Sequence, residues 1–419
     1  MSALDVDKIR EDFPSLQRRI NKKPILYLDS ACMTLKPRQV IKAMQDYYYN
    51  FPACTDRSSH KLSVEVSEAC EEARDKIQKF FNAKRYEEII FTRNTTEAVN
   101  LVARGLDLKE GDTVLTTDKE HNSNLIPWLR LKKKRGIIHK VVKSNSDNTF
   151  NLDAFEKLIN PRVKLVSMVH TSNIDGYTLP AKKIIEIAHQ NGSLVLLDGA
   201  QSAPQIPIDV QELDVDFFAC SLHKMLGPTG VGILYGKYEL LQKLSPLNLG
   251  GDTVSDSTYL SFSLLPPPAK FEAGLQDYAG IIGAGAAIDY LNSVGIENIK
   301  AHEIRLNKII TEGIKDFPGI RIIGPSDPVL RGGIVNFTFD TLGAQDLAMI
   351  LDETANIMVR AGRHCVHSWY HSRRIKESVR ASLYIYNTAW EAEFFVHHLL
   401  TILKKFIKNQ AQKRIFCRS

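Results

Sequence analysis

The chain has few cysteines and no segment of the kind that spans a membrane. Only 6 of its 419 residues are cysteine, and no two of them have the CxxC spacing of a structural zinc site. So low a count in a long chain excludes a disulfide framework and favours a reducing compartment. There is no signal-peptide layout and no long uncharged apolar run, so we expect a cytoplasmic protein without a membrane partner.

The chain also lacks the charge excess of a nucleic-acid-binding protein. Its formal net charge is +6, and much of that comes from residues 130–135 and from the C-terminal tail. Both basic stretches are expected to be solvated helix faces or ends, so no nucleic-acid partner is predicted. The apolar fraction of 44% and the charged fraction of 24% are those of a globular protein long enough for two domains.

Two nucleotide-binding motifs are missing as well. The sequence contains no GxxxxGK[ST] stretch and no GxGxxG stretch that follows a strand into a helix. The first absence argues against a P-loop, and the second argues against a dinucleotide site. Any cofactor is therefore expected to be held in another way.

Short β-rich runs alternate with helical segments through most of the chain. Strands and helices in alternation predict an α/β fold with a mostly parallel sheet that is flanked by helices. After Gly295 the strands are mixed with helices in an α+β pattern. We predict a large domain over 26–295 and a smaller domain formed by 1–25 and 296–419. The predicted strands of the large domain lie within 87–92, 112–117, 163–170, 192–199 and 215–221.

Polar side chains follow these five strands at the point where each one ends. Ligands of open α/β sheets bind at the carboxyl ends of the strands, so these side chains are expected to share one site. Asn94 and Glu97 resemble a capping box, which would open a helix and make its first turn an anion site. The strand-end residues are Thr95 and Thr96, Glu120 and His121, Ser172 and Asn173, Asp198 and Gln201, and Ser221, His223 and Lys224.

Pyridoxal phosphate needs partners of these kinds. Its aldehyde bonds to a lysine amine, and its ring nitrogen needs a carboxylate. Lys224 and Asp198 supply these two groups, and the helix start at Thr95 and Thr96 supplies donors for the phosphate. His121 is a flat partner for the ring, and the ring hydroxyl needs a donor. The predicted cofactor set from the residues is therefore Thr95, Thr96, His121, Asp198, Gln201 and Lys224.

The sequence resembles a known family at this point. The lysine region over 196–235 looks like that of the class V, fold-type I pyridoxal-phosphate enzymes. Together with 92–106, 118–128, 271–274 and 379–388, it resembles the group II cysteine desulfurases, the SufS and selenocysteine-lyase-like branch. The resemblance runs from about Asp7 to the C-terminal helix. It implies a large domain with a mostly parallel seven-stranded sheet, a smaller α+β domain and a homodimer.

The resemblance also implies roles for individual residues. Lys224 would hold the cofactor and act on the substrate, with His121 on the cofactor ring. The residues that would bind the cofactor are Thr95, Thr96, His121, Asn173, Asp198, Gln201, Ser221, His223 and Lys224. Those that would contact the substrate are Asn173, Arg360 and Arg380, of which Arg380 takes the α-carboxylate.

The implied reaction converts L-cysteine to L-alanine and leaves a persulfide on Cys365. Arg363 and His364 are expected to favour the thiolate of that cysteine. An acceptor protein would then take the sulfur for iron–sulfur cluster or thio-cofactor assembly. The alternatives are a selenocysteine lyase, or another class V lyase or epimerase on the same frame. A non-catalytic assembly partner is a third reading, and the complete set of Lys224, Asp198 and His121 speaks against it.

Several residues depart from the family pattern, among them the stretch 56–60. Leu275 stands where a phosphate-contacting threonine is usual, and Asp175 stands where an apolar residue is usual. Cys32 and Cys54 are also unusual, and both belong to segments that the resemblance brings to the mouth of the site. Our hypothesis is that they act with Cys365, either as a thiol relay or as part of an iron–sulfur or zinc site. The alternative is that both are small buried residues.

Overall fold

The computed structural model of the protein describes residues 4–55 and 58–416, with side chains as far as residue 408. Its centre is a seven-stranded sheet in the order β4-β10-β9-β8-β7-β5-β6, and only β10 runs antiparallel to its neighbours. The mostly parallel sheet predicted from the sequence is thereby confirmed. The strands are β4 (Ile89–Thr92), β5 (Thr113–Thr117), β6 (Ile138–Val142), β7 (Val163–Val169), β8 (Leu194–Asp198), β9 (Phe217–Ser221) and β10 (Gly232–Gly236).

Alternate residues of the strands face two different apolar clusters, one on each side of the sheet. Within β9, Phe217 and Ala219 pack with α4 and α5, whereas Phe218 and Cys220 pack with α3, α7 and α10. Side chains of a strand point to opposite faces in turn, so a sheet with helices on both faces needs apolar residues at every position. The helices are α3 (Lys61–Phe80), α4 (Thr95–Gly105), α5 (Asn122–Arg135), α7 (Ala181–Gln190) and α10 (Tyr278–Val294).

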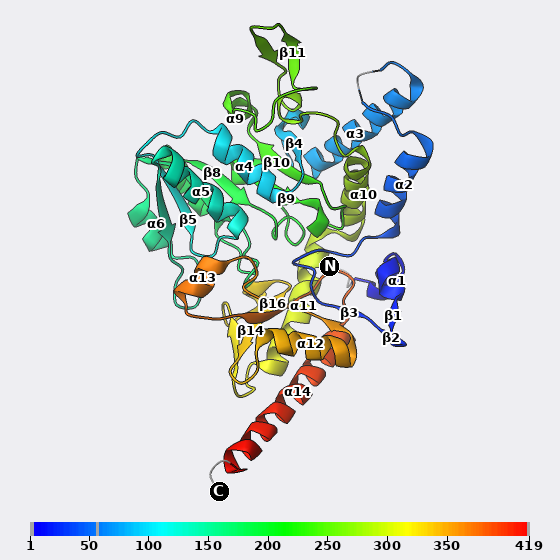
Figure 1. Ribbon diagram of the computed structural model, residues 1–419, viewed down its shortest axis with the longest axis vertical. Coiled ribbons are helices and arrows are strands. Elements are labelled where there is room, and N and C mark those ends of the chain that lie inside the picture. Colours follow the sequence, from blue (N-terminus) through cyan, green and yellow to red (C-terminus); the bar gives the residue numbers. More distant parts are fainter. Residues whose placement is uncertain (1–3, 56–57, 417–419) are drawn as a thin grey trace.

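A second, smaller sheet follows later in the chain and lies below the large one in Figure 1. Its four strands are all antiparallel, in the order β13-β14-β17-β16, and it has an apolar cluster of its own with α11, α12 and α14. The elements are β13 (Ile320–Ile323), β14 (Ile334–Phe339), β16 (Arg360–Gly362), β17 (Ser378–Ser382), α11 (Ile296–Ile314), α12 (Ala344–Ala355), α13 (His367–Ser372) and α14 (Ala389–Phe416).

The N-terminal segment lies against elements from the far end of the chain. The two-residue strand β3 (Leu26–Tyr27) pairs in parallel with β15 (Ile357–Met358). Arg10 of α1 (Val6–Glu11) pairs with Glu391 of α14 at 2.8 Å. The same segment touches α10, since Tyr290 donates to Asp12 at 2.9 Å. The remaining short elements are β1 (Arg19–Ile20), β2 (Lys23–Pro24), α2 (Arg38–Asn50), α6 (Leu152–Leu158), α8 (Val210–Leu213), α9 (Tyr238–Lys243), β11 (Val254–Ser257) and β12 (Phe262–Leu264).

The chain bends by 71° at Gly295, between α10 and α11. This is the position at which the sequence predicts the domain boundary, and the division at 295 stays a prediction. Among the residues described, no single helix has the length and composition of a membrane span, and only α10 and α11 taken together reach them.

Glu303 of α11 is fully buried, and its two carboxylate oxygens have no hydrogen-bond partner. Burial raises the pKa of this carboxyl well above that of a free glutamate. At a pH above the pKa of a free glutamate, the Glu303 carboxyl of the unfolded chain has lost its proton, whereas that of the folded protein keeps it. Stability therefore falls as the pH rises towards the folded pKa, by at most about 1.4 kcal/mol per pH unit.

We predict that Glu303→Gln raises the free energy of unfolding at pH 8 by more than it does at pH 5. The glutamine amide cannot ionise, so the variant does not lose the folding stability that the wild-type protein loses at the higher pH. Urea titrations at both pH values measure the effect. Glu297→Gln, at an exposed position of the same helix, is the control. An equal change at the two pH values would contradict the prediction.

Candidate active site

A cavity of about 250 Å³ lies at the carboxyl ends of the parallel strands. The structure brings together there residues that the sequence predicts from separate strand ends and from the later, antiparallel sheet. Cys32 also lines the cavity. The predicted residues that line it are Thr95, Thr96, His121, Asn173, Asp198, Gln201, Ser221, His223, Lys224, Arg360 and Arg380.

Lys224 enters the cavity from a short 3-10 turn (Leu222–Lys224) that follows β9 directly. The turn is held from outside the sheet. The backbone carbonyl of His223 accepts from Thr34 N at 3.0 Å and from Lys36 Nζ at 2.9 Å. Burial lowers the pKa of the Lys224 amine, while nearby Asp198 acts in the opposite direction. An amine with a lowered pKa is closer to the neutral form that reacts with an aldehyde.

Asp198 is the last residue of β8 and is buried. Its Oδ1 accepts from Ala200 N at 3.0 Å. Burial raises the pKa of this carboxyl, while the Ala200 donor and Lys224 favour its charged form. Gln201 lines the cavity and uses one amide N–H to reach Ala31 O at 2.7 Å.

The start of α4 provides donors at another wall of the cavity. Asn94 caps the helix by accepting from Glu97 N at 3.1 Å, as the sequence predicts. The Thr95 hydroxyl lies 2.6 Å from the Ser221 hydroxyl, and the Thr96 hydroxyl lies 2.6 Å from that of Ser123. Hydroxyls at a helix N-terminus form an anion site.

His121 caps the start of α5 and holds its ring with Nδ1 accepting from Ser123 N at 3.1 Å. Burial, together with the positive charges of Lys224 and Arg360, lowers the pKa of this imidazole to about 3. The ring is therefore neutral near pH 7, which leaves a flat aromatic face on the cavity.

Two arginines stand opposite each other on neighbouring strands, because Arg360 of β16 pairs in register with Arg380 of β17. Arg380 is fully buried, and its guanidinium donates to Asn173 O at 3.0 Å and to Asp29 Oδ1 at 3.1 Å. Burial lowers the pKa of Arg380, and Asp29 opposes that shift. Two guanidinium groups on one cavity wall form a site for a carboxylate.

Cys365 lies on the loop that follows β16, and its sulfur is 3.4 Å from Arg360 Nη2. His364 and Cys365 both have left-handed backbone conformations, with φ of 48° and 59°. Two groups hold this turn, one from the start of α5 and one from the turn after β7. Asn122 N donates to the Cys365 carbonyl at 2.8 Å, and Asn173 Nδ2 donates to the His364 carbonyl at 2.8 Å.

The expected cationic neighbours of Cys365 are corrected by the structure. His364 is buried, and burial together with Arg380 lowers its pKa to about 2, so it carries no positive charge near pH 7. Arg363 turns away and donates to Lys376 O at 3.1 Å. The cationic group next to the Cys365 sulfur is the guanidinium of Arg360 instead.

The metal hypothesis for Cys32, Cys54 and Cys365 is not supported. Within residues 4–55 and 58–416, no group of three or more His, Cys, Asp or Glu side chains is arranged to hold a metal ion. Cys32 lines the cavity, whereas Cys54 packs against the core of the large sheet. Leu275 is 63% exposed and does not line this cavity.

Several residues of the site were not predicted from the sequence. Asp29 follows β3 and binds Arg380, and Ser123 lines the cavity between His121 and Thr96. Asp29 has the signal used for the other positions, since it is a polar residue at the end of a strand, but that strand is only two residues long.

The residues of the cavity fit pyridoxal phosphate. A lysine amine, a buried carboxylate and a neutral imidazole line one cavity together with hydroxyls at a helix start. The Asn173 side-chain oxygen also faces this region as a buried acceptor without a partner among the described residues. Each group matches one need of the cofactor: its aldehyde, its ring nitrogen, its ring face and its phosphate.

Fold, cavity and sequence together define the family. The model of the aminotransferase class-V family matches residues 26–395. The chain belongs to this family, whose members use pyridoxal phosphate.

Several of the similar proteins are named as cysteine desulfurases. A probable cysteine desulfurase of Synechocystis is 40% identical over 402 residues, which are 95% of this chain and 96% of that protein. The cysteine desulfurase of Haloferax volcanii is 40% identical over 409 residues, which cover 94% of this chain and 96% of that protein. The solved cysteine desulfurase of Thermococcus onnurineus matches with a TM-score of 0.91 and 35% identity, over 97% of this chain and 100% of that chain. The solved cysteine desulfurase CsdA of Escherichia coli matches with a TM-score of 0.89 and 32% identity. The match covers 97% of this chain and 100% of that chain.

We predict that Lys224→Ala abolishes the visible absorbance of the lysine-bound cofactor. Lys270 is the matched control, because it too is a buried lysine, and burial lowers its pKa. It donates to Leu241 O and Gln242 O and does not line the cavity, so Lys270→Met should keep the absorbance. Spectra of the two purified variants with added cofactor are the measurement. A normal spectrum in Lys224→Ala would refute the assignment of this lysine.

Proposed function

We propose that the protein is a cysteine desulfurase that converts L-cysteine to L-alanine and receives the sulfur on Cys365. The observation that carries the proposal is the contact between Cys365 and Arg360 at 3.4 Å, because Arg360 lines the cavity together with Lys224 and Arg380. Cys365 itself does not line the cavity, but its sulfur contacts one of the two arginines of the carboxylate site. The sequence similarity to cysteine desulfurases supports the same conclusion.

The chain's own residues divide the work. Arg380 binds the substrate carboxylate, and Arg360 lies beside both that carboxylate and the attacking sulfur. Lys224 moves the proton at the substrate α-carbon, which is general acid–base work for an amine of lowered pKa. Bound pyridoxal phosphate would supply the electron sink, held by Thr95, Thr96, His121, Asn173, Asp198, Gln201, Ser221 and His223 as well as Lys224.

The sulfur step balances without an added oxidant. The Cys365 thiolate attacks the substrate sulfur, a sulfur–sulfur bond forms and the carbon–sulfur bond of the substrate breaks. The substrate carbons end as alanine, and the cysteine side chain ends as a persulfide. We further propose that an acceptor protein takes this sulfur for iron–sulfur cluster or thio-cofactor assembly. Action in the cytoplasm and assembly as a homodimer belong to the same proposal.

Cys365→Ala tests the proposed function. We expect wild-type protein to form alanine from L-cysteine and Cys365→Ala to form almost none, because the sulfur then has no acceptor next to Arg360. Chromatography of alanine and labelling of sulfane sulfur are the measurements. Cys54→Ala is the control, since Cys54 packs against the core of the large sheet. Alanine formation at the wild-type rate in Cys365→Ala would contradict the proposal, and turnover of selenocysteine alone would favour a selenocysteine lyase.

Arg380→Lys tests the carboxylate site. An ammonium cannot hold Asn173 O, Asp29 and a substrate carboxylate together in the planar geometry of a guanidinium. We expect the KM for L-cysteine to rise roughly tenfold while the cofactor absorbance stays. Arg321→Lys, on the exposed edge of β13, is the matched control. An unchanged KM in Arg380→Lys would show that the carboxylate binds elsewhere.

A further inference from the structure

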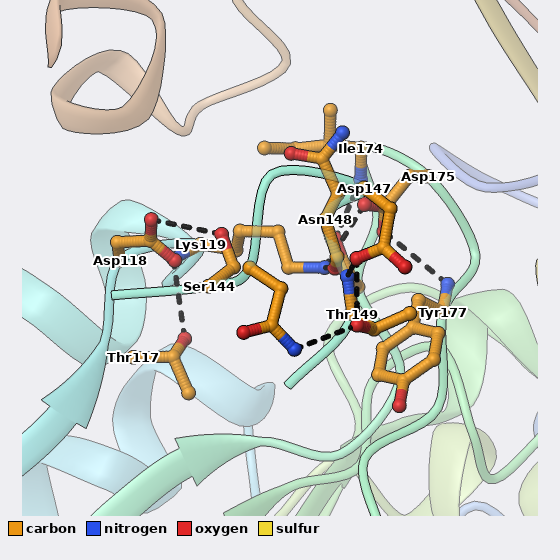
Figure 2. Close-up of polar contacts among 12 residues, drawn as sticks. Thr117, Asp118, Lys119, Ser144, Asp147, Asn148, Thr149, Ile174, Asp175 and Tyr177 are labelled. Carbon is orange, nitrogen blue, oxygen red and sulfur yellow. Dashed lines mark hydrogen bonds and ion pairs between the residues drawn. The ribbon is translucent and has the colours of Figure 1, made fainter. Parts of the chain in front are cut away.

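A buried ion pair lies beside the cavity without lining it. Lys119 Nζ is 2.9 Å from Asp175 Oδ2, and the two side chains are 3% and 0% exposed. Figure 2 shows the Lys119 side chain extending towards Asp175 and Asn148, with the Tyr177 ring nearby. Lys119 also donates to Asn148 O at 2.7 Å, and the other Asp175 oxygen accepts from Tyr177 N at 3.2 Å.

These contacts join the loops that follow three neighbouring strands. Lys119 is two residues beyond β5, Asn148 belongs to the loop after β6, and Asp175 lies in the turn after β7. That turn closes on itself, since Gly176 N donates to Ser172 O at 2.8 Å. The pair is therefore a cross-link at the carboxyl edge of the sheet, where the site is built.

The loop after β5 and the turn after β7 each hold part of the catalytic machinery. The loop with Lys119 continues to Asn122, whose N–H holds the Cys365 carbonyl at 2.8 Å. The turn with Asp175 contains Asn173, whose amide holds the His364 carbonyl at 2.8 Å and whose own carbonyl accepts from Arg380 at 3.0 Å. A shift of either loop would move the sulfur, the carboxylate site or both.

Stability alone does not account for the pair. Desolvation of two charges offsets most of their attraction in a protein interior, so apolar residues of similar size often serve a fold as well. Apolar side chains would fill this space but would not fix the direction of either loop. The turn is also confined from the other side, because a Cβ on Gly176 would lie 1.9 Å from the Arg331 carbonyl oxygen.

We propose that the Lys119–Asp175 ion pair positions Arg380 and Cys365 for the reaction. It does so by locking together the loops that carry Asn122 and Asn173. The proposal rests on the proposed desulfurase activity. Lys119 and Asp175 are positioning residues, since neither one lines the cavity.

Asp175→Asn tests the proposal in the cofactor-loaded, full-length protein. The amide keeps the shape of the side chain and an acceptor for Tyr177, but the charge pair is lost. We expect the KM for L-cysteine to rise at least about fivefold, with a smaller loss in kcat, because Arg380 is displaced. The visible cofactor absorbance should remain, since Thr34 and Lys36 hold the Lys224 turn.

Asp216→Asn is the matched control. Asp216 is also a buried aspartate in an ion pair, with Lys237 at 3.1 Å, but it precedes β9 and so lies at the opposite end of the sheet. Its variant should lose thermal stability as Asp175→Asn does, yet keep the wild-type KM. Lys119→Arg, which retains the charge, should stay close to wild type in KM.

A second variant keeps the proposal testable if Asp175→Asn does not fold. The double change Lys119→Met with Asp175→Leu removes both charges of the pair and leaves the buried Arg331 with the attraction of Asp327 alone. We expect it to fold with a raised KM. A wild-type KM in any folded variant without the pair would overturn the proposal, even where its Tm has fallen. If wild-type protein itself forms no alanine from L-cysteine, the proposed function fails instead, and the two outcomes are thereby distinguished.

Discussion

The site depends on the burial of one cation, the guanidinium of Arg380. A buried charge needs partners, and those of Arg380 come from distant parts of the chain. Asp29 follows the N-terminal strand β3, and Asn173 lies at a strand end of the large sheet. Arg380 itself belongs to the later, antiparallel sheet. The same contact therefore fixes the N-terminal segment and both sheets around the cavity.

The loop of Cys365 is also held by residues from distant parts of the chain. Its sulfur faces Arg360, which pairs in register with Arg380, and its backbone carbonyls are held by Asn122 and Asn173. The carboxylate site and the nucleophile thus share their supports. This sharing explains why a residue outside the cavity, such as Asp175, is expected to affect substrate binding.

Much of the site could be predicted because parallel strands end at one edge of a sheet. Lys224, Asp198, His121 and Asn173 all lie at the end of a recognisable strand or shortly after it. The positions missed depend on contacts that no local pattern reveals. Asp29 meets Arg380 across 351 residues of sequence, and Lys119 meets Asp175 across 56.

The local sequence pattern also did not predict roles that depend on the direction in which a side chain points. Cys32 and Cys54 look alike in sequence, but only Cys32 lines the cavity. His364 next to Cys365 seemed a suitable cation, yet burial keeps it neutral. In the fold, β6 and β10 were both absent from the predicted strands of the large domain, and in β6 polar residues interrupt the apolar pattern.

The most direct test of the account is to follow the substrate sulfur itself. Wild-type protein would be given about one equivalent of isotope-labelled L-cysteine without an acceptor, then alkylated, digested and analysed by mass spectrometry. The account predicts one alanine for each labelled sulfur atom, with the label in the peptide that contains Cys365. Alanine formed while Cys365 stays unlabelled would contradict it.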